Sequence, residues 1–570
     1  MNKKKLLSFA IIVCMICLQT SLTLANGKMT EKDEQFFQVE GTILKKYTGN
    51  EEHIVVPDGI TVIGTKAFAD VRKKVKSIVF PDSVVEIKAF AFVNSTLEKV
   101  VCSKNLKTVG MRAFDGSKNL KEVSNLENVE FMASGAFTNT PWLQEQLQEN
   151  EVLVIGHILY SAKNYDGNLE IPDTIKTIQS FAFSGNEQLT AVTIPTSVTT
   201  IGEGAFQECS NLTSITLPDS ITKIGGGAFT GCTSLQSIHL SNRLKTMERG
   251  IFKDCSSLKS LNIPKSVTVI EKDSFAGCDS LEQLDIPKTV KRIDGNFSKD
   301  CPWWKEQSKN TSLVILNNNL VKVSNYQQED GETLVIPKGV KRISEDAFEG
   351  SGTEYIHKII LPNTVTAIGA GAFSGRNIRE IEIPDSVKSM GKHVFTDCRQ
   401  LKKIKLSRNL KAIPEFAFAD CRSLKQITIP QNVKEIGMEA FFNCIRLKDM
   451  VVPSSMKKAA YKSLSYLDGV VIHGTKGTYL EEVLEESTED DGKATFKVLA
   501  MNKKTAHIKV KQSISLNVGT DTALTKWKSS NTAIATVSDS GKVTGKKEGT
   551  VTIIGTLYGK KYTCKVKVSE

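Results

Sequence analysis

Cysteines recur at a constant spacing of 23 residues, and this spacing most constrains what the chain can fold into. The cysteines in this register are Cys209, Cys232, Cys255, Cys278 and Cys301. A fixed period of about 20 to 50 residues is the signature of stacked repeats, in which each repeat is one coil of a solenoid. The spacing therefore predicts a repeat protein, and it explains how 570 residues can fold without one large compact core.

One coil, residues 212–232, shows what each repeat forms. Leu212, Ile215 and Leu217 have the spacing of a short strand that turns alternate residues inward. Pro218 then ends the strand ladder because proline has no backbone N–H to donate. Residues 221–229 have the apolar spacing of one helical or 3₁₀-like turn that faces the core. The pattern predicts an α/β solenoid, a parallel β ladder with short helical or 3₁₀ returns.

A phenylalanine marks each coil, and its register predicts fifteen coils. With strands about 4.8 Å apart, fifteen coils form a ladder of about 70 Å. The marker residues are Phe68, Phe92, Phe114, Phe137, Phe183, Phe206, Phe229, Phe252, Phe275, Phe297, Phe348, Phe373, Phe395, Phe418 and Phe441.

Two breaks interrupt the period, near residues 138–170 and 298–335, and they resemble each other. Each contains a Pro-Trp pair followed by two apolar strand-like segments, and residues 37–56 carry the second half of the same pattern. We therefore expect three arrays, each opened by a hairpin. Trp142, Trp303 and Trp304 have two interpretations, a stacking site for a ligand or a plug over the end of a coil, and we favour the plug.

The first 25 residues have the three parts of a secretory signal peptide: Lys3 to Lys5, an apolar run from Leu6 to Leu18, and Thr23-Leu24-Ala25. A membrane anchor is the alternative, but a span needs about 20 apolar residues and this run is shorter. The sequence predicts an exported chain that is cleaved after Ala25.

The repeats predict a solenoid over residues 26–485, with a closing cap near 455–485. Residues 486–493 are acidic and polar, which is typical of a linker. Residues 494–570 contain regularly spaced short strands between polar turns, which indicate a small all-β sandwich of the immunoglobulin-like kind.

Eight of the cysteines occupy one position within the repeat: Cys209, Cys232, Cys255, Cys278, Cys301, Cys398, Cys421 and Cys444. Cysteines of an exported protein usually indicate disulfides. A position that repeats once per coil instead indicates a small buried slot, and a free cysteine packs as a small apolar residue. We favour packed thiols over disulfides.

Charge and motifs argue against several functions. Removing Lys3, Lys4 and Lys5 from the formal net charge of +11 leaves +8, and the lysines are scattered among acids, so nucleic-acid binding is not favoured. The histidines are dispersed and form no metal-binding motif. His239 with Cys232, and His393 with Cys398, are better explained as repeat residues than as catalytic pairs. We predict no catalytic residue, no metal and no cofactor.

The candidate binding residues are the side chains that alternate outward along the strand ladder, because such rows suit an extended partner. The alternative is a solvated face without a partner. In the middle array they are Ser214, Thr216, Ser237, His239, Ser260, Asn262, Gln283 and Asp285. In the last array the outward residues are Lys358, Ile360, Glu380, Glu382, Lys403, Lys405, Gln426 and Thr428.

The coil, with Ile-Pro-Asp-Ser-Val, Ile-Gly, Ala-Phe and then Cys, resembles the BspA-type leucine-rich repeats of bacterial surface proteins over roughly residues 40 to 485. The segment from Trp527 to Val551 is similar to a bacterial immunoglobulin-like domain of group 2. The resemblance implies a leucine-rich-repeat solenoid displayed outside the cell, in a family whose studied members are adhesins for host matrix proteins or other cells. It supplies no universal binding residues.

These observations predict an exported or cell-surface binding protein, an adhesin that recognises a host matrix protein, another cell or a glycan through the solenoid face. The alternative is a secreted scaffold or inhibitory module that binds an extracellular enzyme or complex, and an autonomous hydrolase is a weaker third hypothesis. We expect a secreted protein, or one associated non-covalently with the cell surface, with no transmembrane segment after signal cleavage. The oligomeric state is left open.

Overall fold

A computed structural model describes residues 35–70, 73–295, 297, 300–324, 332–350, 352–460, 469–479, 481, 494–519, 525–558 and 560–570. The predicted signal peptide, residues 1–25, and the predicted linker, residues 486–493, lie outside the described residues. The chain divides into two compact units, Met1–Asn150 with Val154–Ile158, and Glu151–Leu153 with Leu159–Glu570.

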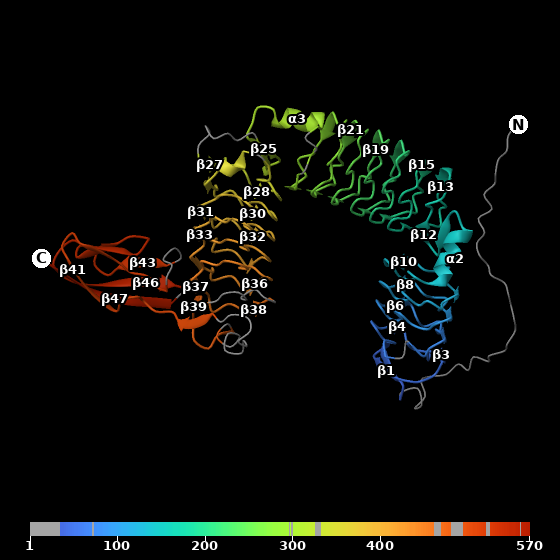
Figure 1. Ribbon diagram of the computed structural model, residues 1–570, viewed down its shortest axis with the longest axis horizontal. Coiled ribbons are helices and arrows are strands. Elements are labelled where there is room, and N and C mark those ends of the chain that lie inside the picture. Colours follow the sequence, from blue (N-terminus) through green and yellow to red (C-terminus); the bar gives the residue numbers. More distant parts are fainter. Residues whose placement is uncertain are drawn as a thin grey trace. The chain divides into compact units, whose positions relative to one another are not determined.

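Each coil contributes two strands that pair in parallel with those of the next coil (Figure 1). We call the longer strand the wide strand and the two-residue strand that follows it the narrow strand. In the first unit the wide strands are β3 (His53–Val55), β5 (Ser77–Val79), β7 (Lys99–Val101) and β9 (Glu122–Ser124). The narrow sheet of this unit contains β1 (Phe37–Glu40), β2 (Ile43–Tyr47), β4 (Val62–Ile63), β6 (Glu86–Ile87), β8 (Thr108–Val109) and β10 (Phe131–Met132).

In the second unit the middle array comes first. Its wide strands are β13 (Gly167–Glu170), β15 (Leu189–Thr193), β17 (Ser214–Thr216), β19 (Ser237–His239), β21 (Ser260–Asn262) and β23 (Gln283–Asp285). The other strands of this part of the chain are β11 (Leu153–Ile155), β12 (Ile158–Ser161), β14 (Thr177–Ile178), β16 (Thr200–Ile201), β18 (Lys223–Ile224), β20 (Thr246–Met247), β22 (Val269–Ile270) and β24 (Arg292–Ile293).

The last array repeats this arrangement. Its wide strands are β27 (Thr333–Val335), β29 (Lys358–Ile360), β31 (Glu380–Glu382), β33 (Lys403–Lys405), β35 (Gln426–Thr428), β37 (Asp449–Val451), β39 (Val471–Gly474) and β40 (Thr495–Val498). The other strands are β25 (Leu313–Leu316), β26 (Asn319–Val323), β28 (Arg342–Ile343), β30 (Ala367–Ile368), β32 (Ser389–Met390), β34 (Ala412–Ile413), β36 (Glu435–Ile436) and β38 (Lys458–Ala459).

The predicted parallel ladder is confirmed, and of the two predicted forms of the return, helical or 3₁₀-like, the structure has the 3₁₀-like one. After the narrow strand the backbone forms separate turns of the 3₁₀ type, with hydrogen bonds from Ala228 N to Gly225 O (3.3 Å), Thr230 N to Gly227 O (2.9 Å) and Cys232 N to Phe229 O (3.2 Å). The helices with described bounds are α2 (Pro141–Glu149), α3 (Pro302–Ser308) and the 3₁₀ helix η2 (Thr353–Tyr355), and the described residues Tyr479 and Glu481 are helical as well.

The phenylalanines that mark the coils form a buried stack along each array. Ring centroids lie 5.3 Å apart between Phe206 and Phe229, and 5.7 Å apart between Phe229 and Phe252, with the rings nearly parallel. All three side chains are fully buried. Each ring therefore removes apolar surface from water together with the rings before and after it, which couples neighbouring coils.

Tryptophans close two of these stacks, as the sequence predicts. Trp142 of α2 lies 4.7 Å from Phe137, and Trp304 of α3 lies 4.6 Å from Phe297 with the two rings parallel. Both helices begin with proline, whose missing N–H costs nothing at the first helical position. The helices thus cover apolar rings that a further coil would otherwise cover.

The expected hairpins are present. β1 pairs antiparallel with β2, and β25 pairs antiparallel with β26. The two hairpins have the same register irregularity, between Gln38 and Val39 in one and between Val314 and Ile315 in the other. In both, the second strand then pairs in parallel with the first narrow strand that follows, so the hairpin starts the ladder.

The repeat cysteines are free, buried thiols. Cys232 Sγ donates to the carbonyl of Phe206 at 3.1 Å, and Cys255 Sγ donates to the carbonyl of Phe229 at 3.1 Å. In the first unit Ser117 occupies the same place and donates from Oγ to Phe92 O at 3.1 Å. The slot therefore suits a small side chain that donates a hydrogen bond, because the buried phenylalanine carbonyl can accept from it as well as from a backbone N–H.

We expect Cys255→Ser to keep most of the stability of the array and Cys255→Ala to lose more. Serine can still donate to Phe229 O, whereas alanine removes one of the two donors to that carbonyl and leaves it bonded to the Cys232 N–H, at a cost of about 0.5 to 1.5 kcal/mol. Hydrogen exchange of the Phe229 and Phe252 amides measures the difference. Equal exchange in the two variants would show that the slot selects only for size.

Buried charges connect the middle and last arrays across the second break. The Asp294 carboxylate is fully buried and accepts from Arg292 Nε at 2.6 Å, from Arg342 Nη2 at 3.0 Å and from the Glu345 backbone N–H at 3.1 Å. Asn317 Nδ2 of the hairpin also donates to Pro287 O at 3.0 Å. These bonds hold together segments that are 30 to 51 residues apart in sequence.

The C-terminal residues form two packed sheets, so the predicted sandwich is confirmed. One sheet has the order β41-β47-β46-β43 and the other β42-β45-β44. The strands are β41 (Thr505–Lys509), β42 (Ser513–Ser515), β43 (Lys526–Ser529), β44 (Ala535–Val537), β45 (Lys542–Gly545), β46 (Gly549–Leu557) and β47 (Lys560–Ser569). Strand β40, which precedes them, pairs in parallel with β39 of the solenoid.

Candidate functional site

The wide strands present two outward side chains from each coil. In β17 the central residue, Ile215, is buried, while Ser214 and Thr216 on either side of it are exposed. Successive side chains of a strand point to opposite faces, so a three-residue strand with an apolar centre necessarily exposes its two ends. Stacking of the coils turns these ends into two outward rows.

In the middle array the structure exposes all eight predicted side chains, from Ser214 to Asp285. The register aligns Ser214 with Ser237 and Thr216 with His239. It aligns Ser260 with Gln283, and Asn262 with Asp285. The two rows thus carry mostly short, neutral groups that can donate and accept hydrogen bonds. Their role in binding stays a prediction.

In the last array the outward rows carry charges that alternate from coil to coil. Lys358 Nζ lies 2.5 Å from Glu380 Oε1, and Lys405 pairs with Glu382. The register places Glu380 beside Lys403 as well. The hydrogen bond from Lys358, together with its charge, holds the pKa of the Glu380 carboxyl below its usual value. Each charge has a neighbour of opposite sign, so the net electrostatic field of this face is small. The face still offers a regular pattern of charged groups that can form hydrogen bonds.

Thr428 is not part of the outward face, so this prediction is wrong. Its side chain is buried, and Thr428 lies beside Val451 in the ladder. Val451 packs in the apolar core of the C-terminal domain, and Tyr558 Oη of that domain donates to Ile429 O. The C-terminal domain therefore covers the outward row at this coil. Gln426, on the other row of the same strand, stays exposed.

Outward apolar residues lie at the beginning of the last array, and the sequence predicted one of them, Ile360. Val335 is 57% exposed and Ile360 is 45% exposed, and the two residues are aligned in neighbouring strands. The alternation that identified Lys358 marks both positions equally well. Val335 was not predicted, although it lies in the same row as Ile360.

The family models that match the chain agree with this geometry. A model described as "BspA type Leucine rich repeat region" matches residues 45–166, 176–303, 236–355 and 341–469, which together are more than half of the chain. The chain belongs to the BspA-type leucine-rich-repeat family. A second model, "Bacterial Ig-like domain (group 2)", matches residues 491–566 of this BspA-type protein.

Several solved structures are similar to the BspA-type chain. A leucine rich cell surface protein of Faecalibacterium prausnitzii is 24% identical, with 77% of this chain and 92% of that chain covered and a TM-score of 0.22. A leucine-rich repeat protein of Bacteroides ovatus is 24% identical, with 81% and 97% covered and a TM-score of 0.27. The pneumococcal vaccine antigen PcpA is 16% identical, with 81% and 95% covered and a TM-score of 0.22. No curated protein matches the chain.

The thiols of this BspA-type protein do not have the environment of a nucleophile. Burial raises the pKa of the Cys398 thiol to about 12, and its Sγ donates to Phe373 O at 3.0 Å. His393 is the residue that the sequence analysis considered with Cys398 as a catalytic pair. Its ring stacks instead on Phe416, with ring centroids 4.7 Å apart. A nucleophilic cysteine needs an accessible thiolate, so this pair does not perform nucleophilic catalysis.

Within the described part of the BspA-type chain, no three histidine, cysteine, aspartate or glutamate side chains are grouped so that they could hold a metal ion. In the same residues, no helix has the length and apolar character needed to cross a membrane.

Proposed function

We propose that this BspA-type protein is exported and binds a protein or glycan ligand outside the cell through the outward rows of its wide strands. The observation that supports this most directly is the register of those rows. Side chains such as Ser214 and Ser237 are aligned on neighbouring parallel strands, at the fixed strand spacing of about 4.8 Å. A rigid row of this kind needs little ordering when it binds an extended partner, which reduces the entropic cost of association.

The two arrays suit different parts of such a ligand. The middle array offers hydroxyl, amide and imidazole groups, as at Ser237, His239 and Asn262. The last array offers paired charges at Glu382 and Lys405, and an apolar pair at Val335 and Ile360. Membership of the family is consistent with a binding module, and the protein is proposed to be either released or held non-covalently at the cell surface.

Charge reversal tests this face. We expect Lys403→Glu with Lys405→Glu to change binding to an array of purified matrix proteins and surface glycans by at least about tenfold, because it places new carboxylates beside Glu380 and Glu382. The matched control is Lys388→Glu with Lys411→Glu. These lysines are exposed in the same array but immediately precede the narrow strands β32 and β34.

Circular dichroism verifies that both double variants are folded. Unchanged binding of the Lys403/Lys405 variant would remove this face from the proposal. Equal changes in both double variants would mean that only the net charge of the chain matters.

A further inference from the structure

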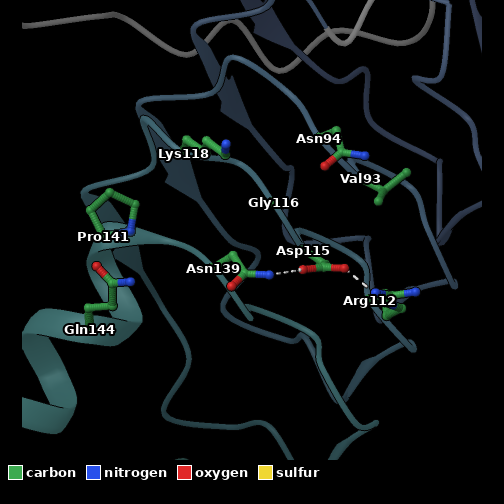
Figure 2. Close-up of a pocket in the computed structure, with 9 residues that line it drawn as sticks. All are labelled: Val93, Asn94, Arg112, Asp115, Gly116, Lys118, Asn139, Pro141 and Gln144. Atoms are coloured by element: carbon green, nitrogen blue, oxygen red, sulfur yellow. Dashed lines mark hydrogen bonds and ion pairs between the residues drawn. The ribbon is translucent and has the colours of Figure 1, made fainter.

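A pocket of about 620 Å³ opens in the first unit, close to the start of helix α2 (Figure 2). Its lining comes from the turns that follow three core phenylalanines and from α2 itself. It is therefore built from turn residues, and its lining includes none of the wide strands that carry the proposed binding face. The volume is in the range of sites that hold one small molecule.

The backbone of the coils creates this pocket. The residue two positions after each of the three core phenylalanines has a positive φ angle: 53° at Asn94, 71° at Gly116 and 58° at Asn139. Gly116 lies near the centre of the lining residues in Figure 2. A Cβ atom on Gly116 would come within 2.1 Å of Asn94 Oδ1. The absence of a side chain there keeps the floor of the pocket open.

A buried carboxylate fixes the base of the pocket. Asp115 is buried, and its Oδ2 accepts from Arg112 Nε at 2.8 Å while its Oδ1 accepts from Asn139 Nδ2 at 3.1 Å. These two bonds orient Arg112 and Asn139. They use Nε of the guanidinium and one donor of the amide, so the terminal amino groups of Arg112 and Oδ1 of Asn139 take no part in either bond.

The remaining polar groups surround this base. Asn94, Lys118 and Gln144 line the pocket and are exposed. The charge of Asp115 offsets that of Arg112, which leaves Lys118 to make the pocket net positive. Val93 and Pro141 supply a small apolar contact. The pocket thus combines one net positive charge and several bifunctional amides with a comparable share of apolar surface.

This set of groups selects a ligand that has hydroxyls and a carboxylate. Amides both donate and accept, which matches neighbouring hydroxyl groups, and the flat guanidinium matches the planar carboxylate of a sugar acid. A single pocket of this size fits one sugar ring better than an extended peptide. We propose that it binds an acidic monosaccharide unit of a glycan, and that it is a recognition site separate from the wide-strand face.

Direct titration of the full mature protein tests this proposal. We expect free N-acetylneuraminic acid or glucuronic acid to bind, and neutral galactose to bind at least tenfold more weakly. Lys118→Glu should weaken binding of the acidic sugar at least tenfold, because the substitution makes the net charge of the pocket negative. The matched control, Lys121→Glu, is exposed in the same coil but does not line the pocket, and it should bind as the parent does.

Two further variants test whether the pocket binds the sugar separately from the wide-strand face. The Lys403→Glu and Lys405→Glu double variant should bind the acidic sugar normally, and a loss there would contradict a separate site. Gln144→Ala changes an exposed side chain. It should weaken binding of the acidic sugar without changing the thermal unfolding temperature of the protein. The proposal is overturned if neither acidic sugar binds, if galactose binds equally well, or if a glutamate-rich peptide competes more strongly than the sugars.

Discussion

Phe229→Ala is expected to open the middle array locally. The ring is fully buried and lies between Phe206 and Phe252, so truncation removes its transfer free energy and leaves a cavity, at a cost of about 3 to 5 kcal/mol. The amides of Phe206 and Phe229, which donate to Ala228 O and Ile251 O, should exchange about 150-fold to several thousandfold faster.

Two controls test this expectation: an exposed phenylalanine, and strands far from Phe229 in the chain. Phe131→Ala removes the same atoms from a side chain that is 55% exposed and should change stability by less than about 0.5 kcal/mol. Coils interact mainly with their neighbours, so exchange in the C-terminal strands β46 and β47 should not change. Uniform acceleration over the whole chain would contradict this nearest-neighbour account of the stack, and no acceleration would contradict the role of the ring.

Asp294→Ala is expected to release the last array from the middle array. The substitution leaves Arg292 and Arg342 without the carboxylate that both contact. Their side chains are 41% and 19% exposed, so water can solvate the released charges, and the lost charge-assisted hydrogen bonds cost about 1.5 to 3 kcal/mol. The backbone N–H of Glu345 also loses its acceptor. Hydrogen exchange over residues 342–346, together with urea unfolding, measures the effect.

The control substitution is Asp70→Ala. Asp70 pairs with Lys46, and both side chains are about half exposed or more, so its loss should cost less than about 1 kcal/mol. Asp294→Asn should fall between the two, because the amide oxygen can still accept from Glu345 N while the charge is lost. If the Asp294 and Asp70 alanine variants were equally stable, the buried cluster would not be what holds the second break.

The sequence predicted the features that repeat. Phenylalanine and cysteine spacing identified the buried side of each coil, and the alternation in Ser214 to Thr216 identified the outward side, because both signals recur many times in one register. It did not predict narrow strands such as β18. Two residues are too few to show the period-two alternation of a strand, and their apolar spacing fits a helical turn equally well.

Helices α2 and α3 were missed although a local signal was present. Thr140 accepts from Leu143 N, and Pro141 takes the first helical position, which is the usual start of a helix. Thr428 failed for a different reason, since its burial depends on Val451 and Tyr558, and the latter is 130 residues further along the chain.

The hairpins and tryptophan helices have a consequence for how such a chain can change in length. β1/β2 and β25/β26 begin their arrays with the same irregular register, and Trp142 and Trp304 each cover a last phenylalanine. An array that has both a starting hairpin and a closing tryptophan leaves no apolar ring uncovered. Duplication or deletion of a whole array therefore preserves a closed core, so the array, as well as the single coil, is a unit by which the gene can lengthen or shorten.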